Sequence, residues 1–551
     1  MSNDPRIPVV IVGGGLVGMA SACFLAQHGI RCLVVEKRQT LSSQPRSRGI
    51  NPRTMELMRE LGVDATIRTS ASAIAMRSNA GIIAMESLAG KDLGALQDRY
   101  LINIDADLSD LTPAEWSLCH QGELEPLLAA HAAELGVTVE FGAEMTRIAQ
   151  DNNGVRVRIQ QKTSAERDIQ ASYVIAADGA GSPIRQGLGI PFAGDSARGH
   201  FMSIHFRADL RRPLRGRQFM MAYTFHPRRA TLTPLDNAEN WVIHAMFDPA
   251  TEPAESFDNE RCTEVVRAIT GVPGLAVEIL GSGPWRSGAA VADRFRQGRV
   301  FLVGDAAHVM PPTGAFGANI GIQDAHNLAW KLAAVLQGTA GEALLDTYDS
   351  ERRPIAEATV RQSVLRSADR PRLAQETPPP PDPEIVTDAQ VWFGGRQLGA
   401  TAATIDEPLE FWPPRPDGSI GTRAPHVPML QAGRAISTID LFGTEFVLFT
   451  GAESTDWQKA CVTVAERLGI LIQHYRIAPN GEERHPINMR QGSTLTDTLH
   501  DHKSLWHDAY GVGTFGAVLV RPDGVVAWRF PGKADNAAAA FTAVLCRVLS
   551  I

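Results

Sequence analysis

The sequence predicts an α/β fold in three parts. These are an α/β domain that opens the chain, an antiparallel β-sheet inserted into that domain, and another α/β domain at the C-terminus. Two observations lead to this prediction. The chain has 551 residues, several times the roughly 150 residues of a typical domain, and 44% of them are hydrophobic, enough for several cores. The hydrophobic pattern also changes character near residue 198 and again near residue 377.

The first 40 residues predict a βαβ unit of the Rossmann type. Residues 9–12 are a β-branched run, residues 16–27 carry apolar side chains at helical spacing, and residues 32–35 are apolar again. The pattern also predicts helices over 52–61 and 122–135, and strands that return to the same sheet over 137–141, 155–159 and 173–176. This block is therefore predicted to be a Rossmann-like domain.

The middle of the chain predicts an inserted antiparallel sheet. Residues 201–206 and 241–247 alternate between apolar and polar side chains, and Pro, Asn and Asp turns separate such segments. The α/β pattern resumes with a strand over 300–303 and a long helical region from 320 to about 365. Because the first domain continues after the sheet, the sheet is an insertion within it.

The C-terminal part begins after a stiff connector, residues 377–383, in which prolines favour an extended chain. After it, strands over 446–450 and 515–520 alternate with helices over 457–468 and 534–549. This pattern predicts another α/β domain of about 155 residues.

Composition excludes several classes of function. A net charge of −8 argues against a protein that binds nucleic acid or anionic membranes. The six cysteines show no C-x-x-C pair or metal-ligand spacing, which predicts no metal site and a reducing compartment. The N-terminus lacks a signal-peptide pattern, and the apolar run 537–546 is about half the roughly 20 residues of a membrane span. We therefore expect a cytoplasmic protein.

Residues 13–18, GGGLVG, match the G-x-G-x-x-G fingerprint of dinucleotide-binding domains. They follow a predicted strand and open a predicted helix, where glycines let the backbone amides approach a pyrophosphate. Glu36 ends the next strand, near the position of the acid that binds the adenosine ribose. The first domain is thus predicted to bind a dinucleotide.

Two later segments indicate that the dinucleotide is a flavin. Residues 177–185, ADGAGSPIR, and residues 304–319, GDAAHVMPPTGAFGAN, each follow a predicted strand. In this order and spacing they resemble the D-G and G-D motifs of flavin-dependent aromatic hydroxylases, the group built like para-hydroxybenzoate hydroxylase. The resemblance continues through residues 322–331 and 348–354.

The resemblance implies FAD as the cofactor. Asp305 follows a predicted strand, where its carboxylate can accept a hydrogen bond from a ribityl hydroxyl, and a helix beginning near 317–319 would stabilise negative charge on the reduced flavin. Arg46 or Arg48 is similar to the family's arginine near the pyrophosphate, and Gln121 to its cofactor-binding glutamine. The expected FAD contacts are Gly13, Gly15, Leu16, Val17, Gly18, Glu36, Lys37, Arg46, Arg48, Gln121, Asp178, Gly304, Asp305, Pro312, Gly317, Ala318 and Asn319.

The resemblance also implies the chemistry. NADPH or NADH would reduce FAD, the reduced flavin would react with O₂, and a flavin C4a-hydroperoxide would hydroxylate a phenolic or polycyclic, polyketide-type substrate under the inserted sheet. The catalytic candidates are His205, Tyr223, His226, His244 and Pro312, and Trp241 and Met246 are further candidates to line the cavity. Alternation defines two faces of the sheet without showing which of them faces the flavin.

Other functions are left open. The same flavin chemistry could perform a Baeyer–Villiger oxygenation, and an oxygen-independent FAD-dependent reductase or dehydrogenase, or a flavin-binding scaffold, could share these motifs. The chain lacks a second G-x-G-x-x-G and a W-x-W-x-I-P segment, which disfavours N-hydroxylating enzymes and flavin-dependent halogenases. His308 lies inside the G-D motif, where a structural role is favoured over that of a general base.

The C-terminal domain resembles, over residues 518–529, the thioredoxin-like domain appended to phenol hydroxylase and bacterial polyketide hydroxylases. Cys461 and Cys546 are too far apart in sequence for a C-x-x-C pair, so we expect a structural or oligomeric role. The predicted domains are an FAD-binding domain over 1–372, interrupted by substrate-domain segments 72–117 and 190–284, a proline-rich linker over 373–394, and a thioredoxin-like domain over 395–551. The expected partners are a small aromatic substrate and O₂, and a homodimer is compatible with the sequence.

Overall fold

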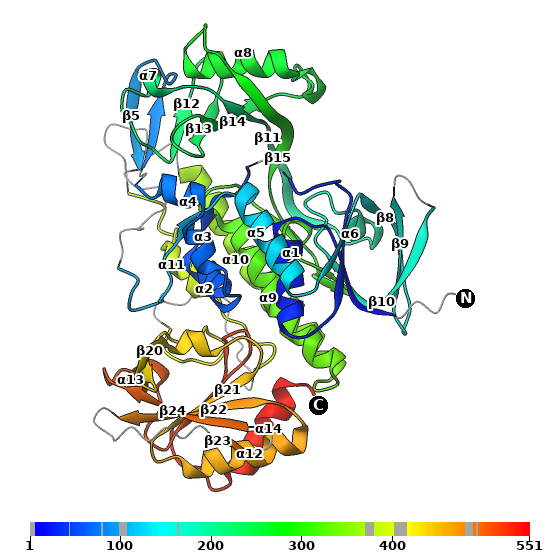
Figure 1. The fold of residues 1–551 in the computed structure, drawn as a ribbon, viewed down its shortest axis with the longest axis vertical. Helices are drawn as coiled ribbons and strands as arrows, with labels where there is room; N and C mark the ends of the chain where they lie inside the picture. Colours follow the sequence, from blue (N-terminus) through cyan, green and yellow to red (C-terminus); the bar gives the residue numbers. More distant parts are fainter. Residues whose placement is uncertain are drawn as a thin grey trace.

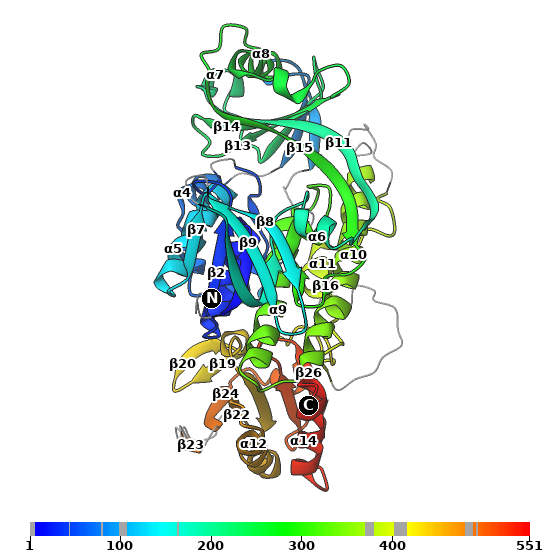
Figure 2. The same ribbon diagram turned by 90° about the vertical axis from the view of Figure 1, so that its right-hand side faces the viewer.

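The structure is a computed structural model, and it describes residues 6–42, 45–78, 81–97, 107–161, 165–369, 380–401, 416–479, 489–491 and 494–551. Three parts, each built on an eight-stranded sheet, are stacked along the long axis of the molecule (Figures 1 and 2). The part that contains both N-terminal strands and long central helices lies in the middle. The inserted sheet lies at one end of the stack and the C-terminal part at the other.

The middle part is built on a mostly parallel sheet in the order β16-β17-β10-β1-β2-β7, with the hairpin β8–β9 beside β10. β1 pairs in parallel with both β2 and β10, and β10 pairs in parallel with β17. The strands are β1 (Ile7–Val12), β2 (Cys32–Glu36), β7 (Thr138–Phe141), β8 (Ala143–Gln150), β9 (Val155–Gln161), β10 (Arg167–Ala176), β16 (Arg296–Gln297) and β17 (Val300–Leu302). A separate pair joins β3 (Gly49–Ile50) to β6 (Ser117–Leu118).

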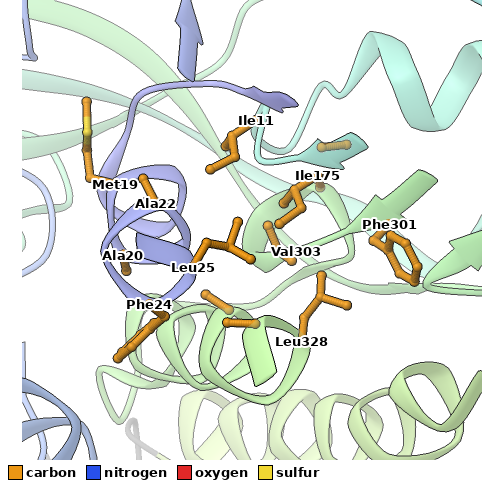
Figure 3. Packing of buried hydrophobic residues seen from close by; sticks show 14 of the residues in the cluster. Ile11, Met19, Ala20, Ala22, Phe24, Leu25, Ile175, Phe301, Val303 and Leu328 are labelled. Carbon is orange, nitrogen blue, oxygen red and sulfur yellow. The ribbon is translucent and has the colours of Figure 1, made fainter. Parts of the chain in front are cut away.

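Helices cover this sheet and bury its apolar side chains. Figure 3 shows Leu25 of α1 (Leu16–Gln27) pointing toward Ile11 and Ile175 of the sheet and toward Leu328 of α9 (Phe316–Leu336), with Phe24 of α1 farther from them. All five side chains are almost completely buried. The other helices of the middle part are α2 (Pro52–Glu60), α3 (Asp64–Arg68), α4 (Ala71–Met76), α5 (Gln121–Glu134), α6 (Pro183–Gly187), α10 (Asp346–Asp369) and α11 (Asp388–Phe393).

The long helical region predicted from 320 to about 365 is two helices, α9 and α10. The chain turns between them, because Gly338 adopts φ +74° and a Cβ on Gly341 would lie 2.1 Å from the carbonyl oxygen of Ser550. A short 3-10 turn (Glu342–Leu345) then leads into α10. The break was missed because apolar spacing alone does not register such a close approach of the C-terminus.

The inserted sheet has the order β18-β15-β11-β14-β13-β12-β4-β5. Its pairs are antiparallel as predicted, except that β12 runs parallel to β4, a strand from earlier in the chain. The strands are β4 (Ile82–Met85), β5 (Asp92–Gln97), β11 (Phe192–Arg207), β12 (Met221–Thr224), β13 (Ala230–Pro234), β14 (Asn240–Phe247), β15 (Glu278–Ala292) and β18 (His308–Val309). The helices α7 (Arg211–Leu214) and α8 (Asn259–Thr270) and a 3-10 turn (Ala254–Ser256) accompany it.

The C-terminal sheet has the order β20-β19-β24-β22-β21-β25-β26, and β23 pairs with β24. Two helices, α12 and α14, pack against each other beside it. The strands are β19 (Pro428–Gln431), β20 (Arg434–Ser437), β21 (Phe446–Gly451), β22 (Ile472–Pro479), β23 (Met489–Gln491), β24 (Thr494–Asp501), β25 (Ala517–Val520) and β26 (Val526–Phe530). The helices are α12 (Thr455–Leu468), α13 (Trp506–Tyr510) and α14 (Ala537–Val548), with a 3-10 turn (Thr438–Leu441).

The structure also bears on the predicted connector, the cysteines, and the search for a membrane span or a metal site. The predicted proline connector is described from Pro380 onward, where the chain is exposed, and residues 377–379 lie outside the described residues. Five of the six cysteines are buried, and Cys546 is partly exposed. Among the described residues, no helix combines the length and the apolar character needed to cross a membrane. In the same residues, no three His, Cys, Asp or Glu side chains are grouped so that they could hold a metal ion.

Candidate active site

The turn between β1 and α1 accepts only glycine at two positions. Gly13 has φ +107°, and a Cβ there would lie 2.2 Å from the carbonyl oxygen of Ala177. A Cβ on Gly18 would lie 1.9 Å from the carbonyl oxygen of Gly13. A Cβ on Gly15, in contrast, would meet only Glu125 Oε1, at 3.7 Å. The chain is therefore tightly packed behind the turn and open in front of it, at the N-terminus of α1, where a helix favours an anion.

Glu36 ends β2 beside this turn and is only 5% exposed. Its Oε2 accepts a hydrogen bond from the Gly14 amide at 2.7 Å, and its Oε1 accepts one from the Arg38 amide at 2.8 Å. Each carboxylate oxygen has a second lone pair, so Glu36 can also accept from a ribose hydroxyl. Lys37, the next residue, is exposed.

The D-G segment follows β10 and is fixed to the G-D segment by Arg185. The guanidinium of Arg185 donates to the carbonyl oxygens of Ala180 at 3.1 Å and Ala306 at 3.3 Å, and it lies 3.6 Å from the centre of the Phe192 ring. Asp178 Oδ2 accepts from the Ile184 amide at 3.1 Å, whereas its Oδ1 is buried without a hydrogen-bond partner. Burial raises the pKa of Asp178.

The G-D segment follows β17 and presents Asp305 as an exposed residue. Protein atoms that crowd its carboxylate remove part of its hydration and raise its pKa, while the charges of His308 and Arg46 act in the opposite direction. Arg46, which is also exposed, is therefore close enough to influence Asp305. This carboxylate can accept a hydrogen bond from a ligand.

A buried ion cluster supports the G-D segment from behind. His308 Nε2 and Asp324 Oδ2 lie 2.7 Å apart, and both side chains are fully buried. Arg352 Nε donates to Asp324 Oδ1 at 2.8 Å, and the Gly304 amide donates to Oδ2 at 3.3 Å. These opposite charges hold the pKa of Asp324 below its usual value despite its burial. His308 is thus part of the support for this loop.

The loop over 311–319 leads into α9, which begins at Phe316. Gly314 and Ala315 adopt left-handed backbone conformations, with φ +89° and +54°, and Pro312 is exposed. The side chain of Asn319 fixes the loop to β3, because its Nδ2 donates to Gly49 O at 2.9 Å and its Oδ1 accepts from the Asn51 amide at 3.0 Å. A Cβ on Gly317 would have only Met310 Cγ within 4 Å, at 3.7 Å. Gly317 therefore leaves space beside the start of the helix, whereas Ala318 packs against the core of the middle part.

The remaining cofactor candidates lie around the same region but have different partners. Gln121 begins α5, where its amide donates to Ser47 O at 2.7 Å and its side chain donates to Glu125 Oε1 at 2.5 Å. Arg48 is buried, and its guanidinium donates to the carbonyl oxygens of Pro234 and Met220, both at 3.1 Å. Arg48 therefore joins the middle part of the molecule to the inserted sheet.

The packing of the inserted sheet shows which of its faces points toward the middle part. Met202, Ile204, Phe206 and Trp241 pack with residues of α8 in a hydrophobic cluster. On the opposite face, β15 carries Trp285 on the same side as Ala289 and Val291, which pack into the core of the middle part. The sheet that carries this second face is joined to the G-D segment, since β18 begins three residues after Asp305 and pairs with β15.

Five of the predicted substrate-site residues lie on strands of this sheet, four of them on the second face and one on the other. His205 and His244 belong to the second face, because their chain neighbours Phe206 and Ile243 point to the other face. The same alternation and the strand register place Tyr223 of β12 and the exposed Met246 on the second face. Trp241 belongs to the other face, where its indole N–H donates to Ala208 O at 3.2 Å. His226 follows β12 in a turn, and its amide donates to Glu86 O. Only the second-face residues share the side from which Ala289 and Val291 pack into the middle part.

An aromatic and polar cluster lies in the middle of the second face. The rings of Phe201 and Trp285 are stacked, with centroids 4.6 Å apart, and His244 contacts the Trp285 ring edge to face. Ser203 Oγ and His244 Nδ1 lie 2.7 Å apart. Burial and the charge of Arg48 lower the pKa of His244 to about 4, so its imidazole is neutral at pH 7. A flat aromatic ligand could stack here and hydrogen-bond to a neutral imidazole.

Comparison with known proteins identifies the family. A family model described as an FAD-binding domain matches residues 6–363, and one described as the C-terminal domain of aromatic-ring hydroxylases matches residues 417–550. The chain is 37% identical to tetracenomycin A2 monooxygenase-dioxygenase of Streptomyces glaucescens, over 100% of this chain and 98% of that protein. It is 36% identical to 4-methyl-5-nitrocatechol 5-monooxygenase of a Burkholderia species, over 99% of this chain and 98% of that protein.

The chain belongs to the FAD-dependent aromatic hydroxylases. A solved structure, the ternary complex of aklavinone-11 hydroxylase with FAD and aklavinone, matches it with a TM-score of 0.87 at 35% identity, covering 100% of both chains. The protein is thus a flavin-dependent monooxygenase, as its sequence motifs predict.

The residues of this hydroxylase fit FAD. The glycine turn excludes side chains behind it and leaves open space in front of α1. Asp178 Oδ1 is a buried acceptor without a partner, Asp305 is an exposed acceptor, and Gly317 borders open space. These groups would hold the two ends of a dinucleotide. The individual FAD contacts, however, stay predictions.

Two site residues of the hydroxylase were missed from the sequence. Trp285 lies in a segment whose apolar alternation is weakened by glycines and a proline, so the segment was not predicted as part of the sheet. Glu125 follows Gln121 by four residues, so both project from one face of α5. That spacing could have shown that Glu125 lies beside the cofactor glutamine.

Proposed function

We propose that this hydroxylase consumes NAD(P)H and O₂ and hydroxylates a phenolic or polycyclic aromatic compound of the polyketide type. The observation that carries the proposal is that the inserted sheet is joined to the G-D segment through the pairing of β18 with β15, while Ala289 and Val291 of its second face pack into the core of the middle part. A ring held against Phe201 and Trp285 would lie on this second face. Relatives named as monooxygenases of tetracenomycin A2 and a nitrocatechol support this substrate class.

When bound, FAD supplies the redox and oxygen chemistry. The chain itself orients the aromatic substrate and controls its proton. His244 is neutral at pH 7, and Ser203 occupies its Nδ1, so Nε2 is the ring nitrogen available to a substrate hydroxyl. The positive charge of Arg48 acts on His244 and would also stabilise a phenolate beside it. A phenolate is the better nucleophile, so this arrangement favours hydroxylation of the ring.

Oxygen labelling tests the proposed function. We would screen phenols and polycyclic quinones for accelerated NADPH oxidation and then repeat the reaction under ¹⁸O₂. The proposal requires one labelled oxygen in a product that keeps its ring carbons intact. A labelled ester or lactone would instead indicate a Baeyer–Villiger oxygenase. Turnover that proceeds without oxygen, giving a reduced or dehydrogenated product, would indicate a reductase or dehydrogenase.

The C-terminal domain is proposed to be thioredoxin-like and to have a structural role. In support, β21 and β22 are parallel with α12 between them, and the antiparallel pair β25–β26 lies beside β21 and is followed by α14. This order of elements is that of a thioredoxin core. Burial raises the pKa of the Cys461 thiol to about 12, which suppresses the reactive thiolate.

A further inference from the structure

The carboxyl group of Glu125 lies at the N-terminal end of α1, near Gly15 and Leu16. Its Oε1 accepts a hydrogen bond from the Leu16 amide at 3.0 Å, although Glu125 itself belongs to α5. The Leu16 amide is among the N–H groups at the beginning of α1 that have no partner within the helix. These are the groups that bind a pyrophosphate in dinucleotide-binding domains. A carboxyl group of the protein therefore shares the position where the cofactor carries its negative charge.

The two oxygens of Glu125 have different surroundings. Oε1 accepts from Leu16 and also from Gln121 Nε2 at 2.5 Å. Oε2 is buried and has no hydrogen-bond partner, and the whole residue is only 1% exposed. A buried carboxylate with an unpaired oxygen is costly, whereas a proton on that oxygen would remove the charge.

The groups around Glu125 offset only part of the effect that burial has on its pKa. Arg38, after β2, lowers its pKa, as do hydrogen bonding from Gln121 and the backbone amides of Leu16 and Ser42, but burial has the largest effect and raises the pKa above the usual value. α1, which packs against α5, carries no charged side chain. Another carboxylate at the turn is that of Glu36, which accepts a hydrogen bond from the Gly14 amide. Two further negative charges from a pyrophosphate would favour the neutral form of Glu125 more strongly.

We propose that Glu125 is a proton-linked positioning residue for FAD, which keeps its Oε1 bond to the Leu16 amide and takes up a proton on Oε2 when the cofactor binds. The proton comes from solvent, so FAD binding consumes up to one proton at this site and no covalent bond changes. The carboxyl then orients the first turn of α1 without repelling the pyrophosphate. The inference uses the FAD binding of this family and does not depend on which substrate is oxidised.

Calorimetric titration of FAD into the full-length, FAD-depleted protein tests this proposal. The number of protons taken up is obtained from titrations in two buffers of different ionisation enthalpy, at pH values between 6 and 8.5. We expect uptake in the wild type and a Kd for FAD that rises with pH by up to about tenfold per unit. Glu125→Gln keeps the shape and the hydrogen bonds, and it should lower proton uptake by about half a proton or more without weakening FAD binding at pH 8.5.

Glu134→Gln, on the exposed end of the same helix, is the matched control and should behave like the wild type. Asp178 also has a raised pKa and could take up a proton, so the comparison between variants rather than the wild-type value decides. Equal proton uptake in the wild type and Glu125→Gln would overturn the proposal. So would a loss of FAD affinity in Glu125→Gln at every pH, because the ionised carboxylate would then be required.

Infrared difference spectroscopy of the wild type keeps the proposal testable if Glu125→Gln does not fold. FAD binding should produce a carbonyl band of a protonated carboxyl group that shifts in D₂O. The absence of such a band would contradict the inference even if the enzyme hydroxylates its substrate. Conversely, the band could be present in a protein that never uses oxygen, so this test and the test of the proposed function fail independently.

Discussion

At the level of single residues, the carboxylates of the cofactor site differ in how many hydrogen bonds they already accept from the protein. Glu36 already accepts two backbone amides, whereas Asp305 is exposed and Asp178 has a buried oxygen with no partner. Asp178 and Asp305 can therefore accept additional hydrogen bonds from a ligand, and such bonds would stabilise the complex most at these two residues.

Asp305→Ala should weaken FAD binding. A charge-assisted hydrogen bond is worth about 1.5–3 kcal/mol, which corresponds to roughly a 10- to 150-fold increase in Kd. Dialysis followed by flavin absorbance measures the loss, and Asp293→Ala in the exposed turn before β16 is the control. Full retention of FAD by Asp305→Ala would show that this carboxylate does not contact the cofactor.

His474 should make the protein sensitive to acid. It is fully buried in the C-terminal domain between Thr450 Oγ1 at 2.9 Å and Thr496 Oγ1 at 3.3 Å, and burial lowers its pKa from 6.5 to about 4. The unfolded chain binds a proton at this histidine more readily, so stability is complete above pH 6.5 and falls as the pH drops toward 4. The loss from this residue is about 3 kcal/mol.

Urea unfolding at pH 7 and pH 4.5 measures the effect of His474. His474→Gln can still hydrogen-bond to a threonine and does not titrate, so its stability should fall less between these two pH values than that of the wild type. His426 and His244, each with a pKa lowered to about 4, continue to contribute in the variant. An identical fall in both proteins would mean that His474 does not titrate on unfolding.

At the scale of elements, the start of α9 is arranged to leave space. The left-handed residues Gly314 and Ala315 turn the chain into the helix, and the Asn319 side chain fixes the loop to β3. Gly317 borders open space, so a side chain there would reach into the volume beside the helix N-terminus rather than into the protein.

Gly317→Val should therefore leave the fold intact and impair oxygen transfer. Its Cβ meets only Met310 Cγ within 4 Å, so we expect a change in unfolding free energy of about 1 kcal/mol or less, the helix propensity of valine exceeding that of glycine. We expect slower hydroxylation and more hydrogen peroxide, because a displaced flavin would be exposed to water. Stopped-flow kinetics and peroxide quantification measure both. Normal coupling of NADPH oxidation to product would contradict this role.

The elements of the cofactor site could be predicted from the sequence better than those of the substrate site. Gly13 and Gly304 have left-handed or otherwise unusual backbone conformations and Gly18 lies too close to Gly13 O for a Cβ, so these motif positions require glycine in the structure. Trp285 and Glu125 act through neighbours that are distant in sequence, Phe201 and Leu16, and no local pattern records such contacts. The choice between the two faces of the sheet likewise needed the packing of α8 and of Ala289.

At the scale of the whole molecule, buried charges join the C-terminal domain to the middle part. Arg521 donates to Glu351 Oε1 at 2.7 Å and to Asp523 Oδ1 at 2.9 Å, and Lys331 donates to Glu351 Oε2 at 2.8 Å. Asn327, one turn earlier on α9, donates to Asp523 Oδ2 at 3.1 Å. Opposite charges hold the pKa of Glu351 far below its usual value, and burial lowers the pKa of Lys331 to about 8. A second contact pairs Arg423 with Glu56 of α2.

Arg521→Ala should destabilise the folded protein by about 3–5 kcal/mol, because it leaves two buried carboxylates with one lysine. Thermal unfolding and FAD retention measure the effect, and Arg467→Ala, an exposed residue of α12, is the control. The additional loss of flavin from Arg521→Ala would show that α9 transmits the damage to the cofactor loop. An unchanged melting temperature would mean that the cluster does not hold the domains together.

The buried charge cluster also limits how this enzyme can be recombined with its relatives. The proline-rich connector offers an obvious junction for chimaeras. However, α9 extends for about 31 Å from the cofactor loop to the interface with the C-terminal domain, so this one helix contributes both to the cofactor site and to that interface. A C-terminal domain exchanged at the connector would bring its own partners for Lys331 and Glu351. Successful chimaeras should therefore need residues 327, 331 and 351 to be exchanged together with the new domain. The set of residues that must be exchanged as a unit is thus larger than the domain that begins after the connector.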